Sequence, residues 1–260
     1  MEYATLFKTL LPALAHKKLP LLLGGTSNHF RTAILRRVGA WDPYNVTEDA
    51  DLGLRLSRLG YETSILDSIT YEEANPELKN WLQQRARWLK GFLQTWLVHM
   101  RQPAVLTRAI GLDGFWVMNA MTLGIVVSAL FHPFLIIYAV FDLCSAASDA
   151  AELFLQAHFM SALNVVVLFC GYAFSIFSGY RALRLKRITG WWSTLLTMPL
   201  YWILMTVAGW MAIWQFIFHP FHWNKTRHGL SSVQRPAISS KVFIWRPFIW
   251  RALIWRPWPR

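Results

Sequence analysis

The sequence predicts a partial α/β domain in residues 1–110, followed by a bundle of transmembrane α-helices in residues 111–218. Two observations predict this division. Most of the acidic residues precede residue 111, in a stretch where short apolar runs alternate with segments of helical periodicity. From about residue 112 to residue 218 charged residues are rare apart from one basic loop, and 55% of the whole chain is hydrophobic. This composition is too apolar for an ordinary soluble domain.

The first part of the chain has the pattern of alternating helices and strands. Residues 4–16 have helical spacing. Residues 19–24 form an apolar run that ends at a pair of glycines, which is typical of a buried strand. A short helix is then expected from Arg31, and Gly39 closes it.

A further helix is expected to begin at Thr47, whose hydroxyl can cap the first turn. Glu48 and Asp49 follow in that turn, where the helix dipole favours negative charge. Gly60 ends the helix, and residues 61–66 suit a second strand.

Residues 77–99 predict a longer helix with a stripe of aromatic side chains and one cation. Side chains of this kind favour the boundary between a bilayer and water, so we expect this helix to lie on the membrane surface. The stripe consists of Trp81, Arg85, Trp88, Phe92 and Trp96.

Three apolar blocks make up the predicted membrane region, at residues 112–147, 158–179 and 193–218. A single helix through the first block would be roughly 50 Å long, against a hydrocarbon core of about 30 Å. Because His132-Pro133 interrupts this block, we expect a tight hairpin there and four spans in total. Three spans are the alternative, since four would place the basic residues 181–187 outside, against the positive-inside tendency.

Two segments follow the membrane region. Residues 219–235 are expected to be a cytosolic segment next to the membrane. Residues 236–260 are rich in Trp and Arg and repeat Ile-Trp-Arg every five residues. Repeated proline prevents a continuous helix there, and we interpret this tail as an extension without function rather than a membrane-surface element.

The net charge of +12 at pH 7 raises the question of nucleic acid as a partner. The cations flank apolar spans and fill the tail instead of covering one soluble face, so anionic lipid headgroups are the better partners and no nucleic acid is expected. Cys144 and Cys170 lie in or next to apolar spans, which argues against a disulfide framework or a zinc site.

Two motifs together carry the functional signal: Thr47-Glu48-Asp49, and about 35 residues later Gln84-Arg85-Ala86-Arg87-Trp88, just before the apolar spans. Either motif alone is weak, because acids open many helices and Trp/Arg helices often anchor proteins at membranes. In this order they resemble the back half of a bacterial, membrane-bound family 2 glycosyltransferase of the cellulose-synthase-like kind. The resemblance covers about residues 1–233 and implies the acceptor half of a GT-A-like, Rossmann-related domain.

The resemblance implies roles for the first motif. Asp49 corresponds to the catalytic base of the family, and Thr47 and Glu48 would shape the acceptor end of the site. Such chemistry needs one carboxylate to deprotonate an acceptor hydroxyl while the nucleoside diphosphate leaves.

The second motif corresponds to the Gln-x-x-Arg-Trp signature of the family, with Gln84, Arg85, Arg87 and Trp88 as acceptor- or donor-binding residues. The resemblance places the arginine near the diphosphate and the tryptophan under the acceptor sugar. A planar guanidinium suits phosphate oxygens. After the membrane region, Lys225, Thr226 and His228 resemble a gating loop that closes over the nucleotide.

Asp49-Ala50-Asp51 looks like a metal-binding Asp-x-Asp motif, but residues two apart on a helix point in different directions. Only 48 residues precede Asp49, too few for a nucleotide-binding half. We therefore expect this chain to lack the nucleotide- and metal-binding half and to be inactive alone. The complete enzyme would use Mg²⁺ or Mn²⁺ and a nucleotide sugar, with a UDP-sugar favoured by the resemblance.

The resemblance thus implies an inverting glycosyltransferase that extends a polysaccharide. It would be a multi-pass protein of the inner (plasma) membrane, with its catalytic segment in the cytosol. One alternative is a non-catalytic subunit of a split synthase, paired with a separate chain that supplies the missing half. Another is a transporter or channel, which the scarcity of charge within the spans argues against.

Overall fold

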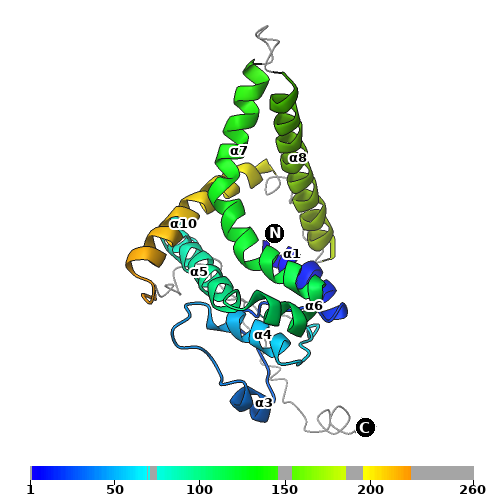
Figure 1. Cartoon of the computed structure of the whole chain (residues 1–260), viewed down its shortest axis with the longest axis vertical. Coiled ribbons are helices and arrows are strands. Elements are labelled where there is room, and N and C mark those ends of the chain that lie inside the picture. Colours follow the sequence, from blue (N-terminus) through cyan, green and yellow to red (C-terminus); the bar gives the residue numbers. More distant parts are fainter. Residues whose placement is uncertain (1, 69, 71–74, 146–153, 186–195, 224–260) are drawn as a thin grey trace, which may run out of the picture.

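The computed structural model describes residues 2–68, 70, 75–145, 154–185 and 196–223. In this part the chain is built from α-helices and two short π-helices, labelled η (Figure 1). In chain order they are α1 (Glu2–Thr5), η1 (Leu6–Leu10), α2 (Leu11–His16), α3 (Thr32–Arg37), α4 (Glu48–Arg58), α5 (Leu78–His99), α6 (Pro103–Asn119), η2 (Ala120–Gly124), α7 (Ile125–Ser145), α8 (Phe154–Leu185) and α10 (Met198–Phe218).

The predicted α/β domain is wrong for the described residues, because none of them lies in a strand. Residues 19–24 and 61–66, expected as strands, are irregular segments without sheet pairing. A strand needs a neighbouring strand to satisfy its backbone hydrogen bonds. The first segment packs on α4 instead: a Cβ placed on Gly53 would lie 2.1 Å from the carbonyl oxygen of Leu21.

Helix α4 lies at the centre of the part that precedes the membrane region. Leu52 and Leu56 pack against Val38 and its neighbours on one side. Leu54, on another side, packs against residues of α6, including Leu106. Burial on several sides holds α4 in place, and with it the Thr47-Glu48-Asp49 motif at its first turn.

Helix α5 lies along α10 rather than standing apart from the bundle. At one end of the contact, the rings of Trp81 and Tyr201 meet edge to face, with centroids 5.7 Å apart. At the other end, Lys90 donates to carbonyl groups just after α10. Ala86 and Leu89 of α5 belong to one core with residues of α7 and α10: Val126, Ala129, Met205, Ala208 and Ala212.

Three stretches of the described chain are long and apolar enough to cross a membrane: Pro103–Asp142, Phe159–Leu185 and Met198–Phe218. The tight hairpin expected at His132-Pro133 is not formed, because α7 continues through Pro133. A proline removes one helical hydrogen bond, but packing against a neighbouring helix can offset that loss. Such packing occurs one turn earlier, where a Cβ on Gly209 of α10 would lie 3.4 Å from the Cβ of Ala129.

Helices α7 and α8 run beside each other and project from the rest of the molecule (Figure 1). The far end of α8 returns to the start of the chain, where Ala182 and Leu183 pack against Ala4 of α1. The cations Arg181 and Arg184 at this end of α8 therefore lie on the same side of the bundle as α1.

Candidate active site

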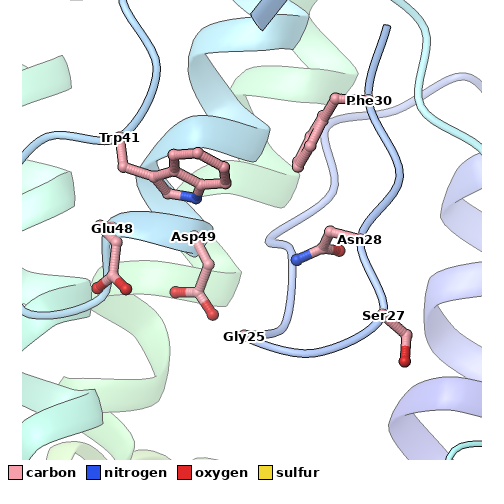
Figure 2. Close-up of a pocket in the computed structure, with 7 residues that line it drawn as sticks. All are labelled: Gly25, Ser27, Asn28, Phe30, Trp41, Glu48 and Asp49. Atoms are coloured by element: carbon pink, nitrogen blue, oxygen red, sulfur yellow. The ribbon is translucent and has the colours of Figure 1, made fainter. Parts of the chain in front are cut away.

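A cleft of about 430 Å³ opens at the start of α4. Figure 2 shows the carboxylates of Glu48 and Asp49 on one side, the indole of Trp41 beside them, and the loop that carries Gly25 and Asn28 opposite. Ser27 and Phe30 complete the lining. The cleft thus combines two carboxylates with hydroxyl, amide and aromatic groups, a set suited to binding a polyhydroxylated ligand.

Asp49 is held in a defined position at the edge of this cleft. The backbone N–H of Ala50 donates to Asp49 Oδ1 at 2.8 Å, which leaves Oδ2 on the side of the Gly25 loop. A Cβ on Gly25 would lie 3.2 Å from Oδ2, tighter than ordinary van der Waals contact. Glycine at this position therefore lets the backbone approach the carboxylate closely.

The surroundings of Asp49 favour its protonated form. Partial burial raises its pKa above the ordinary value, and the charge of Glu48 adds to the rise. The hydrogen bond from Ala50 and the charge of Arg87 lower the pKa and offset the rise only in part. A carboxylate with a raised pKa is a stronger base, and this is the property that proton abstraction requires.

Thr47 does not cap α4 with its side chain, contrary to the expectation from its position. Its hydroxyl donates to Asn45 Oδ1 at 3.3 Å, and its backbone N–H donates to the same oxygen at 2.9 Å. The side chain is buried against α5, where a Cβ on Gly91 would lie 2.2 Å from Thr47 Oγ1. Thr47 therefore joins the first turn of α4 to α5.

Arg87 lies on the face of α5 that approaches the two carboxylates. Burial lowers the pKa of Arg87, whereas the charges of Glu48 and Asp49 raise it, and an arginine remains charged at neutral pH. Within the described part of the chain, no carboxylate pairs with Arg87 within 4.0 Å, and its Nε is buried without a hydrogen-bond partner. Its guanidinium thus retains capacity to bind an anion.

Arg85 and Trp88 belong to a different face of α5. Arg85 pairs with Glu2 of α1 at 2.6 Å, and its guanidinium lies 4.4 Å from the centroid of the Trp88 ring. The ring of Tyr3 stacks on Trp88 at 6.2 Å. The structure therefore brings Thr47, Glu48, Asp49 and Arg87 together, and directs Arg85 and Trp88 toward α1. Gln84 is half-buried one turn before Arg87.

A buried network between α4 and α5 was not anticipated from the sequence. Asp51 Oδ1 lies 2.9 Å from His99 Nε2, and both side chains are almost fully buried. Arg55 donates to Asp51 Oδ2 at 2.7 Å, and Arg58 contacts His99 Nδ1 at 3.0 Å. The spacing of Asp51 and Arg55, four residues apart on a helix, was a signal for part of this network. The contact with His99 had no signal, because 48 residues separate the partners.

No group of three or more His, Cys, Asp or Glu side chains that could hold a metal ion occurs among the residues that the structure describes. Glu48 and Asp49 supply two carboxylates, and Arg87 already compensates part of their charge. These residues by themselves do not form a metal site. Lys225, Thr226 and His228, which resemble a gating loop, lie outside the described residues.

Comparisons with known proteins identify the family of this chain. Residues 12–226 match the model of the family described as glycosyl transferase family group 2, so the chain belongs to that family. The "Probable glycosyltransferase YdaM" of Bacillus subtilis (strain 168) is 35% identical over 68 residues, which are 26% of this chain and 16% of that protein. The aligned part thus spans about a sixth of the relative. No solved structure matches.

Proposed function

We propose that this chain carries the acceptor side of a membrane-bound, inverting glycosyltransferase that adds sugars to a growing polysaccharide. The family supports transfer of a sugar from a nucleotide donor to an acceptor. One observation supports the assignment of the site: Asp49, with a raised pKa, lines the cleft, and Arg87 of the neighbouring α5, whose charge acts on Asp49, has unused hydrogen-bonding capacity. The reaction needs a base and, near it, a group that binds an anion.

Asp49 would act as the general base. Its carboxylate takes the proton from an acceptor hydroxyl, and the acceptor oxygen forms a bond to the anomeric carbon of the donor sugar. The bond between that carbon and the diphosphate oxygen breaks, and its electron pair leaves with the nucleoside diphosphate. Attack from the face opposite the leaving group inverts the anomeric configuration.

Arg87 would stabilise the charge that develops on the departing diphosphate. A guanidinium offers paired N–H donors that match phosphate oxygens, and a partly buried position strengthens the interaction. The charge of Arg87 also keeps Asp49 from becoming too weak an acid, since it lowers the pKa that burial raises. Trp41 at the edge of the cleft offers an indole surface to the acceptor sugar.

In this proposal Trp88 does not form the floor under the acceptor sugar that the resemblance implied. Tyr3 stacks on its ring, and the guanidinium of Arg85 lies over the ring as well. An acceptor sugar that used Trp88 as its floor would have to displace Tyr3. Arg85 and Trp88 therefore pack against α1, whereas Glu48 lines the cleft and Thr47 holds the first turn of α4 against α5.

The proposed location is the inner (plasma) membrane, with the cleft on the cytosolic side. Three described stretches can cross a membrane by length and composition. Because the end of α8 and the turn after α10 both lie on the side of α1, α4 and α5, α6–α7 and α8 supply the crossings in this proposal and α10 lies along α5. The basic end of α8 packs beside α1, on the same side of the α7 and α8 pair as α4 (Figure 1), whose first turn lines the cleft. Basic residues on the cytosolic side agree with the positive-inside tendency and with contact to anionic lipids.

In the complete enzyme, residues beyond those described would bind the Mg²⁺ or Mn²⁺ ion. They would also recognise the UDP-sugar or other nucleotide sugar. We propose that a nucleotide-binding half, on the same polypeptide or on a separate chain, completes the site against the cleft. Enzymes of this family generally use a nucleotide-sugar donor together with a divalent metal ion. The cleft supplies only two carboxylates as ligands for such an ion.

The test is incorporation of label from a panel of nucleotide sugars into polymer by membranes of the source cells. Replacement of the native gene with an Asp49→Asn version should abolish incorporation at unchanged protein level, while binding of the nucleotide sugar persists. Arg87→Lys should retain the charge and weaken turnover. Full incorporation by the Asp49→Asn membranes would refute the role of Asp49.

A further inference from the structure

Two polar side chains of α5 hold the turn that follows α10. The ammonium of Lys90 donates to the carbonyl oxygens of His219, at 3.2 Å, and His222, at 2.7 Å. One helical turn later, Gln94 Nε2 donates to the carbonyl oxygen of Pro220 at 2.8 Å. Lys90 and Gln94, here called the α5 clamp, thus satisfy three carbonyl groups that lie beyond the last turn of the helix.

Lys90 is an unusual residue at this position because its side chain is completely buried. Lysine is almost never fully buried unless its charge is compensated. Burial lowers the pKa of Lys90, and the charge of Arg87 lowers it further. A Leu or Met could fill the same volume at lower cost, so the ammonium is explained by the carbonyl groups that it binds.

The clamped turn leads directly to the candidate active site. Trp223 follows His222, and the guanidinium of Arg87 lies over the Trp223 ring, 5.8 Å from its centroid. Arg87 precedes Lys90 by three residues on α5 and so lies on a neighbouring part of the same helix face. Through this face, α5 connects the carboxylates of α4 with the chain that leaves α10.

We propose that Lys90 and Gln94 are positioning residues, which place Trp223 against Arg87 and so set the orientation of the guanidinium whose charge acts on Glu48 and Asp49. This inference rests on the proposed function, because it assigns the clamp to the donor-binding side of that site. An indole packed on a guanidinium restricts its rotation and leaves its N–H groups free to bind an anion. How rigidly the turn after α10 is held would thus control how tightly the site binds a diphosphate.

The clearest variant is Gln94→Glu. It keeps the shape of the side chain and an oxygen that can accept from the N–H of Val46, which lies 3.3 Å from Gln94 Oε1. It removes only the N–H donor to Pro220 and places a carboxylate against that carbonyl group. Lys90→Met removes the other half of the clamp and keeps the unbranched stem. Gln83→Glu, on the same helix, is the matched control for added charge.

The first measurement reports on the turn and requires no activity. A nitroxide spin label at Phe221→Cys, in a Cys144→Ser, Cys170→Ser background, is followed by EPR in nanodiscs. Phe221 is exposed, so a label fits there. Gln94→Glu and Lys90→Met should each increase the mobile component of the spectrum at least twofold, and Gln83→Glu should leave it unchanged. Unchanged spectra in both clamp variants would overturn the proposal.

The second measurement separates positioning from mere support of the fold. In active membranes, the clamp variants should raise the donor KM at least fivefold, with the acceptor KM and the thermal midpoint unchanged. A raised mobility with an unchanged donor KM, or with a lowered thermal midpoint, would overturn the positioning role. If wild-type membranes transfer no sugar while the spectra change as expected, the clamp stands and the proposed function fails.

Discussion

Asp51 Oδ1 and His99 Nε2 lie 2.9 Å apart in a buried contact that joins α4 to α5. Asp51→Asn would keep the shape of the side chain but remove the charge that faces His99 and Arg55. Because buried polar partners are costly to leave unsatisfied, we expect a loss of roughly 1–3 kcal/mol in stability. The thermal midpoint in detergent measures it. Asp42→Asn, at a site outside this network, serves as a control, and equal midpoints for the two variants would contradict the prediction.

The same carboxylate should give the protein a distinct response to acid. Burial by itself would raise the pKa of Asp51, but the hydrogen bond with His99 and the charge of Arg55 outweigh it and lower the pKa below the ordinary 3.8. A lowered pKa contributes stability that is complete above pH 3.8 and is lost as the pH falls through the folded-state value. The difference in midpoint between wild type and Asp51→Asn should therefore shrink below pH 3.8. A difference that stays constant to lower pH would disprove this assignment.

The charge of Asp49 should have the opposite effect on stability, although Asp49 lies only two residues before Asp51. Its raised pKa means that ionisation costs stability, a cost that appears as the pH rises above 3.8 and is complete above the folded-state pKa. At neutral pH, Asp49→Asn should therefore raise the thermal midpoint slightly while it abolishes turnover. Opposing effects of this kind are common where a site keeps a strained group for function. A lowered midpoint would show that Asp49 serves the fold instead.

The helices of this chain were predictable where their pattern is local. Glu48–Arg58 and Leu78–His99 begin and end within a few residues of the expected bounds, because apolar spacing indicates both helices and Gly60 marks the end of the first. The strands were not predictable in this way. An apolar run such as residues 19–24 fits a strand or a buried loop equally well, and neighbouring segments decide between them.

The candidate site was predictable in its residue types but not in their directions. Arg87 and Trp88 are adjacent in the motif, yet adjacent helical residues point about 100° apart, and the structure turns only Arg87 toward Asp49. Lys90 is an ordinary surface residue by sequence. Its burial depends on carbonyl groups more than 120 residues away, which no local pattern indicates.

The approach of Gly25 to Asp49 gives a test of the cleft itself. Gly25→Ala would place a Cβ 3.2 Å from Asp49 Oδ2, and the carboxylate would have to shift by a few tenths of an ångström. Because small displacements of a catalytic base are costly, we expect kcat to fall about tenfold with little change in the thermal midpoint. Gly24→Ala is the control, since its Cβ meets only Phe7 at 3.4 Å. Equal activity of the two variants would mean that Asp49 is not the base.

The contact between Gly91 and Thr47 fixes the distance between α5 and α4. Gly91→Ala would place a Cβ 2.2 Å from Thr47 Oγ1 and 2.7 Å from Thr47 Cβ, so the two helices must separate. Overpacking of this kind costs typically 1–3 kcal/mol, and the thermal midpoint should fall accordingly. Gly171→Ala in α8 should leave the midpoint unchanged, because nothing lies within 4 Å of its Cβ.

A second substitution distinguishes this clash from a general intolerance of side chains at position 91. Thr47→Ala removes the two atoms nearest the new methyl group, Oγ1 and Cγ2, and should restore part of the stability lost in Gly91→Ala. The double-mutant cycle measures this coupling directly. Additive effects would show that α5 and α4 are not in contact through these residues. In that case the contact between Asp51 and His99, rather than the one between Thr47 and Gly91, would hold α4 against α5.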